Sequence, residues 1–221
     1  MRYEKKYRVS ISKFSSIISH IRELSFKEIY KERYVSSIYY DTLDFKLFRD
    51  SIRGISKREK IRLRFYNEEC KKIYIEKKIK LGDLGYKIIN PLNKNNPYKL
   101  INLSIKSSPN KILNGKNILI PHNIEYFYYP VSLVGYLRKY YISNDKMIRI
   151  TLDKKINYSK IIKKKDNYIQ INNIPEKNGV IEIKFEEDKE LSKRVINKLT
   201  YLFSSNLSRN SKYCNSIELL Y

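Results

Sequence analysis

The stretch that decides the fold is KIRLRFY, residues 60–66, in which cationic and apolar side chains alternate strictly. Successive side chains of a β-strand point to opposite faces, so one face of this strand is cationic and the other is apolar. The two faces carry Lys60, Arg62 and Arg64 against Ile61, Leu63 and Phe65. Like charges side by side repel each other, so a purely cationic face requires a nearby counter-charge.

The same separation of charge from hydrophobicity recurs along the chain. Alternation predicts further strands at 2–9, 71–80, 134–143, 147–153 and 180–188. In the last of these strands, Glu182 and Lys184 alternate with isoleucine and phenylalanine. Several strands are therefore expected to have one charged face and one hydrophobic face.

Two architectures accommodate such strands. In an open sheet, the charged face is a solvated surface. In a closed barrel, the hydrophobic residues face outward under covering helices and the charges line a water-filled lumen. Amphipathic helices are expected at 12–24 and 191–203, and both need an apolar surface to cover. We therefore expect an α+β fold, a closed antiparallel β-barrel forming a charged tunnel with covering helices, in a single domain spanning residues 1–221.

The segments between these strands give weaker signals. Residues 33–42 are β-branched and aromatic and are expected to form another strand, followed by a short helical turn at 45–48. Residues 81–86 are interpreted as a turn, and 90–117 as a loop around a helix at 98–105. Residues 153–179 are interpreted as a polar connector holding one short strand. The tail from residue 209 is expected to end in a short helix.

Composition points to a globular protein with an anionic partner. Hydrophobic residues make up 42% of the chain, and 46 Lys and Arg outnumber 23 Asp and Glu, for a formal net charge of +23. Such an excess favours nucleic acid, anionic membrane or small phosphorylated ligands. The two cysteines, Cys70 and Cys214, lack metal-site spacing and indicate a reducing compartment. With no apolar signal core near residue 1, we expect a cytoplasmic protein.

The chain resembles the triphosphate tunnel metalloenzymes (the CYTH-like superfamily), and among them the polyphosphate polymerase (VTC) branch. The resemblance rests on motifs in family order: RYEKKY (2–7), VSSIYYDT (35–42), KIRLRFY (60–66), IEKK (75–78), YLRKYY (136–141), IRITLD (148–153), VIEIK (180–184) and NSKY (210–213). It implies a barrel of about eight antiparallel strands. The chain is most similar to the short stand-alone bacterial members, because it contains nothing like the sensor domain or membrane segments of the eukaryotic polymerases.

The resemblance also implies a set of site residues. Residues expected to act on the transferred phosphoryl group are Arg62, Arg64, Lys78, Arg138 and Arg149. Further phosphate-binding residues are Lys6, Lys60, Lys184, Arg209 and Lys212. Glu182 is expected to bind Mn²⁺ or Mg²⁺, with Glu4 and Glu76 as supporting acids at the metal. Asp153 is a further supporting position.

The implied reaction transfers the terminal phosphoryl group of ATP onto a growing inorganic polyphosphate chain. The acceptor is already an anion, so no side chain is needed to create a nucleophile, and electrostatic stabilisation carries the catalysis. Two alternatives stay open: a triphosphatase with the same ligands and a positioned water, and a non-catalytic module that binds polyphosphate or nucleic acid. No specific nucleic acid is expected, because RNA-binding signatures are absent from the sequence. By analogy, the family implies a membrane protein partner at the inner face of a membrane.

Overall fold

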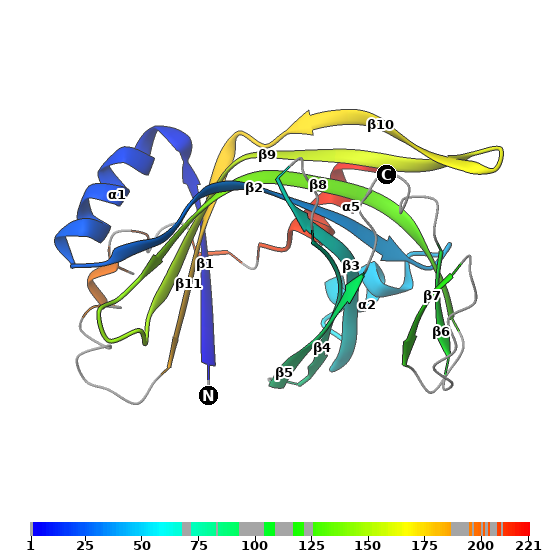
Figure 1. Cartoon of the computed structure of the whole chain (residues 1–221), viewed down its shortest axis with the longest axis horizontal. Helices are drawn as coiled ribbons and strands as arrows, with labels where there is room; N and C mark the ends of the chain where they lie inside the picture. The colour runs from blue at the N-terminus through cyan, green and yellow to red at the C-terminus, as the bar shows by residue number, and fades with distance from the viewer. Residues whose placement is uncertain are drawn as a thin grey trace. The chain divides into compact units, whose positions relative to one another are not determined.

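The computed structural model is mainly antiparallel β-structure with few helices (Figure 1). It describes residues 2–67, 72–82, 84–92, 104–108, 117–121, 126–186, 195, 197–199, 201, 203, 207–208 and 210–221. The expected α+β class is therefore confirmed. Among the helices formed by these residues, none combines the length and the apolar character needed to cross a bilayer.

The sheet formed by the described residues has eleven strands, eight of which follow one another in the order β1-β11-β9-β8-β2-β3-β4-β5. Their bounds are β1 (Arg2–Ser10), β2 (Lys27–Asp41), β3 (Lys57–Tyr66), β4 (Ile73–Leu81), β5 (Leu84–Leu92), β8 (Tyr126–Ile142), β9 (Arg149–Lys164) and β11 (Asn178–Glu186). Off this path, β10 (Asn167–Pro175) pairs with β9, and β6 (Ser104–Ser108) pairs with β7 (Asn117–Pro121) and β8. The helices are the 3₁₀ turn η1 (Ile11–Lys13), α1 (Phe14–Glu23), α2 (Lys46–Ile52) and α5 (Lys212–Leu220).

The path of eight strands agrees with the expected number, although the sheet formed by the described residues has eleven strands, and the expectation of a closed barrel was an overstatement. Closure requires backbone pairing between the two end strands, and no pairing among the described residues joins β1 to β5. The edge of β1 away from β11 meets a different segment. Tyr7 forms an isolated bridge with Leu207, and the Ser208 amide donates a hydrogen bond to the Lys6 carbonyl at 2.9 Å.

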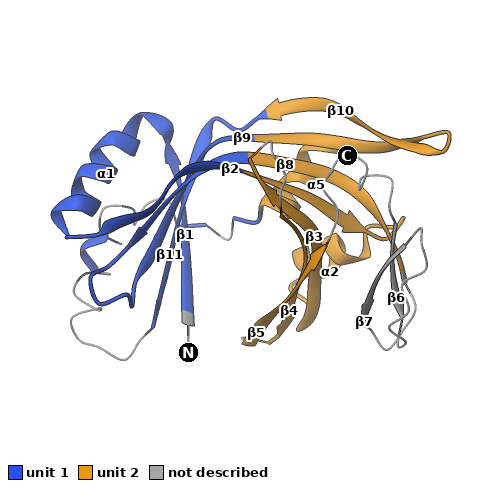
Figure 2. Ribbon diagram, viewed as in Figure 1, with its two compact units in different colours: residues 1–34, 136–156, 175–211 blue, residues 35–135, 157–174, 212–221 orange. Residues whose placement is uncertain are grey.

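The chain forms two compact units (Figure 2). Unit 1 comprises residues 1–34, 136–156 and 175–211; unit 2 comprises residues 35–135, 157–174 and 212–221. The strands β2, β8 and β9 each contribute to both units because they are long, at 15, 17 and 16 residues.

Unit 1 buries the apolar faces of β1, β9 and β11 against α1. Tyr7, Ile181 and Leu152 lie directly opposite one another across the three strands, so their side chains share a face. The buried face of α1, with Ile17 and Ile21, packs in the same core. The described residues of the expected helix at 191–203 are helical, and Leu199 and Phe203 of this segment join the core. The predicted covering of an apolar sheet face by helices is therefore confirmed in unit 1.

Unit 2 buries the apolar face of β2, β3 and β4. Ile38, Leu63 and Ile75 are register partners, and at most 2% of each is exposed. The opposite face of the same strands carries the arginines of KIRLRFY. Both units thus repeat the pattern seen in the sequence, because β3 and β4 in unit 2 and β11 in unit 1 each have a hydrophobic face and a charged face.

Three expectations about connecting segments were wrong where the structure describes them. The expected helix at 98–105 falls mostly outside the described residues, and its end at Ser104 and Ile105 belongs to strand β6. The segment interpreted as a turn leads directly into β5, and the polar connector is a hairpin of β9 and β10. Polar strands of this kind lack clean alternation, because hydrophobic periodicity appears only where one face is buried consistently.

Candidate functional site

The charged face of unit 1 carries a cluster of two carboxylates and two ammonium groups. Glu4 and Lys6 lie on β1, directly opposite Lys184 and Glu182 of β11. Lys6 Nζ is 2.7 Å from Glu4 Oε1, and Lys184 Nζ is 2.7 Å from Glu182 Oε1. The crossed contacts, Lys6 to Glu182 and Lys184 to Glu4, are longer, at 3.9 and 3.6 Å. The register therefore brings together four of the residues predicted from sequence.

Glu182 is the most strongly perturbed acid of this cluster. Burial raises the pKa of Glu182, but the charges of Lys184, Lys6 and Arg138 outweigh burial and hold that pKa well below its usual range. Its side chain is only 12% exposed. Glu182 is therefore a carboxylate throughout the physiological pH range, as a ligand for a divalent cation must be.

Arg138 is fixed by a buried partner. Its Nε and Nη2 atoms donate to Oδ1 and Oδ2 of Asp153 at 2.5 and 2.7 Å, and Asp153 is fully buried. The guanidinium also lies over the rings of Tyr136 and Tyr140, 5.0 and 5.8 Å from their centroids. Burial lowers the pKa of Arg138, but Asp153 outweighs it and the pKa is raised above its usual value. A bidentate pair of this geometry positions the arginine.

The oxygen atoms of unit 1 fit a hard divalent cation. Glu182 and Glu4 are adjacent carboxylates, and Thr151, the register partner of Glu182 on β9, has a buried hydroxyl with no hydrogen-bond partner among the described residues. Magnesium is commonly held by one or two carboxylates, with water and substrate phosphates filling the other positions. No group of three His, Cys, Asp or Glu residues suited to a metal occurs in the part of the chain that the structure describes. Glu182 and Glu4 are the residues that would hold Mn²⁺ or Mg²⁺.

The charged face of unit 2 gathers cations around one carboxylate. Arg62 donates from Nε to Glu76 Oε2 at 2.7 Å, and Lys87 donates to Oε1 at 2.6 Å. Arg64 Nη1 lies 3.8 Å from the same carboxylate, and only 10% of the Arg64 side chain is exposed. Burial raises the pKa of Glu76, but Arg62 and Arg64 outweigh it and hold the pKa at about 2. Both oxygens of Glu76 therefore serve as acceptors for cations.

Three lysines lie side by side next to this group. Lys60, Lys78 and Lys87 are register partners across β3, β4 and β5, so their side chains share one face. Like charges directly opposite each other destabilise a sheet unless an anion is close. Sequence reasoning missed Lys87 because residues 81–86 were interpreted as a turn. The residues around Lys87 gave no signal of a strand, because Ile88 and Ile89 are adjacent and do not alternate with polar residues.

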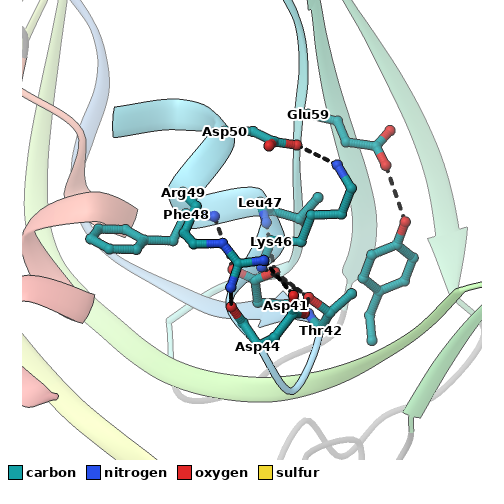
Figure 3. Close-up of polar contacts among 10 residues, drawn as sticks. Asp41, Thr42, Asp44, Lys46, Leu47, Phe48, Arg49, Asp50 and Glu59 are labelled. Atoms are coloured by element: carbon teal, nitrogen blue, oxygen red, sulfur yellow. Dashed lines mark hydrogen bonds and ion pairs between the residues drawn. The ribbon is translucent and has the colours of Figure 1, made fainter. Parts of the chain in front are cut away.

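The helices of unit 2 are attached to the sheet by Asp41, at the end of β2 (Figure 3). Its carboxylate accepts hydrogen bonds from the backbone amides of Thr42, Leu47 and Phe48, at 2.7, 2.8 and 3.0 Å. The Tyr213 hydroxyl of α5 donates to the same carboxylate. Asp41 therefore holds the first turn of α2 and the beginning of α5, where Lys212 lies.

The aromatic ring of Tyr213 links α5 to the cationic face. It stacks on Tyr39 of β2, with the centroids 5.2 Å apart and the rings inclined by 29°. Lys60 Nζ lies 5.8 Å from the centre of the Tyr213 ring and donates to Cys214 Sγ at 3.6 Å. In unit 2, α5 thus contacts the face that carries the predicted phosphate ligands.

The predicted residues fall into two groups. Unit 1 contains Glu4, Lys6, Arg138, Arg149, Glu182 and Lys184; unit 2 contains Lys60, Arg62, Arg64, Glu76, Lys78 and Lys212. Arg149 is exposed. It lies directly opposite Lys184 on the neighbouring strand, and therefore on the charged face of unit 1. Arg209 lies outside the described residues. In the cluster of unit 1, two carboxylates balance the charges of two lysines. In unit 2, the one carboxylate of Glu76 lies beside three cations.

Solved structures share this fold over almost their whole length. A Vibrio parahaemolyticus protein named as a candidate adenylate cyclase is 13% identical with a TM-score of 0.53, covering 98% of this chain and 97% of that chain. A Bacillus halodurans protein of the same description is 16% identical with a TM-score of 0.54, covering 100% and 97%. A Hippeastrum protein named as a candidate adenylyl cyclase with dominant triphosphatase activity is 16% identical with a TM-score of 0.50, covering 99% and 96%.

The chain therefore has the same fold as these three solved proteins. The model of one family, the VTC domain, matches residues 1–221. The chain therefore belongs to the VTC domain family, and the resemblance inferred from the sequence motifs is confirmed. No curated protein sequence matches the chain.

Proposed function

We propose that this protein is a metal-dependent polyphosphate polymerase, which transfers the terminal phosphoryl group of ATP onto inorganic polyphosphate and releases ADP. The observation that carries the proposal is the cationic face of unit 2, where Arg62, Arg64 and Lys87 surround the single carboxylate of Glu76. Membership of the VTC domain family supports it. The family model spans both units, which supports treating residues 1–221 as one catalytic domain.

The residues of unit 2 suit the binding of consecutive phosphates. A guanidinium group binds two phosphate oxygens at once, whereas a lysine acts as a point charge. Glu76 holds the Arg62 guanidinium in place through Nε and Nη2. The lysine row of Lys60, Lys78 and Lys87 continues the positive face along the sheet.

The residues of unit 1 suit the phosphoryl transfer itself. A bound Mn²⁺ or Mg²⁺ would supply a Lewis acid that neutralises charge on the phosphoryl oxygens. Glu182 and Glu4 hold negative charge for such a cation, and Arg138, oriented by Asp153, presents a fixed positive charge. The transition state of phosphoryl transfer is loose, so positioning and electrostatic stabilisation provide most of the catalysis. By analogy with the family, we place the reaction in the cytoplasm, with a membrane protein as partner.

A triphosphatase is the second candidate. The observation that favours it is the shared fold with the Hippeastrum protein, which is described as having dominant triphosphatase activity. The same cations would bind the triphosphate, and water would replace polyphosphate as the acceptor. The two candidates differ in their products: a polymerase makes long chains and ADP, and a triphosphatase makes free phosphate.

The proposal is tested with purified protein, ATP and Mn²⁺, with products separated by length. We expect ADP and long polyphosphate chains from the wild-type protein. Arg64→Ala and Glu182→Ala should abolish both products while circular dichroism shows retained structure. The control Arg53→Ala removes an exposed arginine next to α2 and should leave the products unchanged.

Undiminished turnover in either site variant would contradict the assignment of the site. Free phosphate without chains would support the triphosphatase. Tight polyphosphate binding without turnover would instead support a non-catalytic module.

A further inference from the structure

Tyr39 lies among the cations of unit 2. It is the direct register partner of Arg62, so both side chains are on the charged face. Arg62 Nη1 donates a hydrogen bond to the Tyr39 hydroxyl at 3.2 Å. Only 5% of Tyr39 is exposed. The phenol group is therefore a buried polar group inside the predicted phosphate site.

The hydroxyl hydrogen of Tyr39 is not used in this contact. A guanidinium group has donors and no acceptor, so the Tyr39 oxygen must be the acceptor in its bond with Arg62. Among the residues that the structure describes, this is the one hydrogen bond of the Tyr39 side chain. Buried hydroxyl groups normally donate as well as accept, and a phosphate oxygen is a strong acceptor.

Three residues that are predicted to bind phosphate influence the pKa of the Tyr39 hydroxyl. Burial raises the pKa of Tyr39, but the charges of Arg62, Arg64 and Lys212 outweigh burial and lower it below its usual value. The next residue, Tyr40, faces the opposite side of β2, is fully buried, and has a raised pKa because of burial. Two adjacent tyrosines thus occupy opposite environments, and only Tyr39 lies with the cations.

The ring of Tyr39 is also held in place. It stacks on Tyr213, and the Tyr213 hydroxyl donates to the buried carboxylate of Asp41. Asp41 is in turn anchored by backbone amides of α2. The position of the phenol is therefore determined by packed groups on its ring face and at its hydroxyl.

We propose that Tyr39 is a substrate-binding residue that donates its hydroxyl hydrogen to an oxygen of the phosphate chain bound by Arg62, Arg64 and Lys212. This inference rests on the proposed function, because it takes a linear phosphate chain as the ligand. It adds a neutral donor to a site otherwise composed of charges. A neutral donor contributes geometric selectivity that a diffuse positive charge does not provide.

The test compares Tyr39→Phe with the wild-type protein by calorimetric titration with tripolyphosphate. Phenylalanine keeps the ring that stacks on Tyr213 and removes only the hydroxyl. A hydrogen bond to a charged group is worth enough that we expect the dissociation constant to rise about 10- to 100-fold. The matched control is Tyr86→Phe, an exposed tyrosine on the opposite face of β5, which should bind as wild type.

A second readout separates a lost hydrogen bond from a disturbed site. Tyr39→Phe removes no charge, so the salt dependence of tripolyphosphate binding should stay that of the wild type, whereas Arg62→Ala should flatten it. Thermal unfolding confirms that the variant is folded. A flattened salt dependence in Tyr39→Phe would overturn the inference, because it would show that the arginines had moved.

The outcomes distinguish this inference from the proposed function. If wild type turns over ATP and Tyr39→Phe binds tripolyphosphate equally well, the inference fails and the function stands. If wild type binds tripolyphosphate without turnover and Tyr39→Phe binds weakly, the inference stands and the polymerase proposal fails. If wild type does not bind tripolyphosphate, both fail.

Discussion

Glu76 shows how a single residue organises a cationic site. Three cations surround it, and the carboxylate would be costly to bury without them. Glu76 also orients Arg62 and Lys87, whose positive charges would repel each other without the carboxylate. The Glu76 carboxylate is therefore the internal counter-ion of the cationic face of unit 2.

This role predicts a pH-dependent effect of Glu76→Gln on stability. The folded-state pKa of about 2 lies below the ordinary 4.5, so ionised Glu76 stabilises the fold above pH 4.5. That stabilisation is lost as the pH falls from 4.5 towards 2. The difference between the two pKa values corresponds to about 3 kcal/mol. We expect the variant to be less stable than wild type by about this much at pH 7. Urea unfolding measures it.

The two stability curves should converge as the pH falls below about 2, where Glu76 is protonated in both the folded and the unfolded protein. Glu28→Gln, at an exposed position of β2, is the control and should follow the wild-type curve. A constant difference between wild type and Glu76→Gln across the acid range would contradict the ionic role.

Glu182 gives a second prediction at the scale of the residue. A cation that binds only the folded protein raises its unfolding free energy, by about 2.7 kcal/mol at a hundred times the dissociation constant. We expect Mn²⁺ to raise the melting temperature of the wild type, and Glu182→Gln to lose most of this rise. Thermal unfolding with and without Mn²⁺ measures it, and an equal rise in the variant would exclude Glu182 as a ligand.

At the scale of the element, the contact of α1 with β11 depends on a residue without a side chain. A Cβ at Gly179 would overlap the ring of Phe14 and lie 2.8 Å from the carbonyl oxygen of Asp153. The helix therefore lies as close to the sheet as it does because position 179 is glycine. Asp153 also accepts the hydrogen bond of Arg138. A backbone shift at Asp153 would therefore displace the partner that positions Arg138.

Gly179→Ala should destabilise unit 1. Overpacking of this kind costs about 1–3 kcal/mol, because Phe14 must move and the backbone at Asp153 must shift. Denaturant unfolding measures the loss. Gly85→Ala is the matched control, since its new Cβ would meet only ordinary contacts at 3.6 Å. Equal stability of the two variants would show that α1 tolerates displacement from β11.

The elements also show how far the sequence could predict this fold. Strands β3 and β11 were predictable because one face of each is apolar and buried, so Leu63 or Ile183 alternates with a charge. Strand β5 was not, because its side chains are mainly exposed on both faces and carry no period. The pairing of Arg138 with Asp153 was not predictable either, because it depends on the register of β8 against β9, which alternation within one strand does not specify.

At the scale of the whole molecule, the net charge of +23 favours the binding of anionic ligands such as the polyphosphate that we propose. It follows that polyphosphate should bind much more weakly at high salt. The Debye length falls from about 10 Å at 0.1 M to about 3 Å at 1 M, so we expect the affinity to drop by more than about tenfold across this range. Titration at several salt concentrations measures it, and an affinity independent of salt would contradict a charge-based site.

The central claim is that this chain builds polyphosphate from ATP. The most direct measurement follows ATP labelled in its terminal phosphate, incubated with the protein, Mn²⁺ and a short polyphosphate primer. The account predicts that the label appears in chains longer than the primer, with one ADP formed for each phosphate added. Label recovered only as free orthophosphate would contradict it.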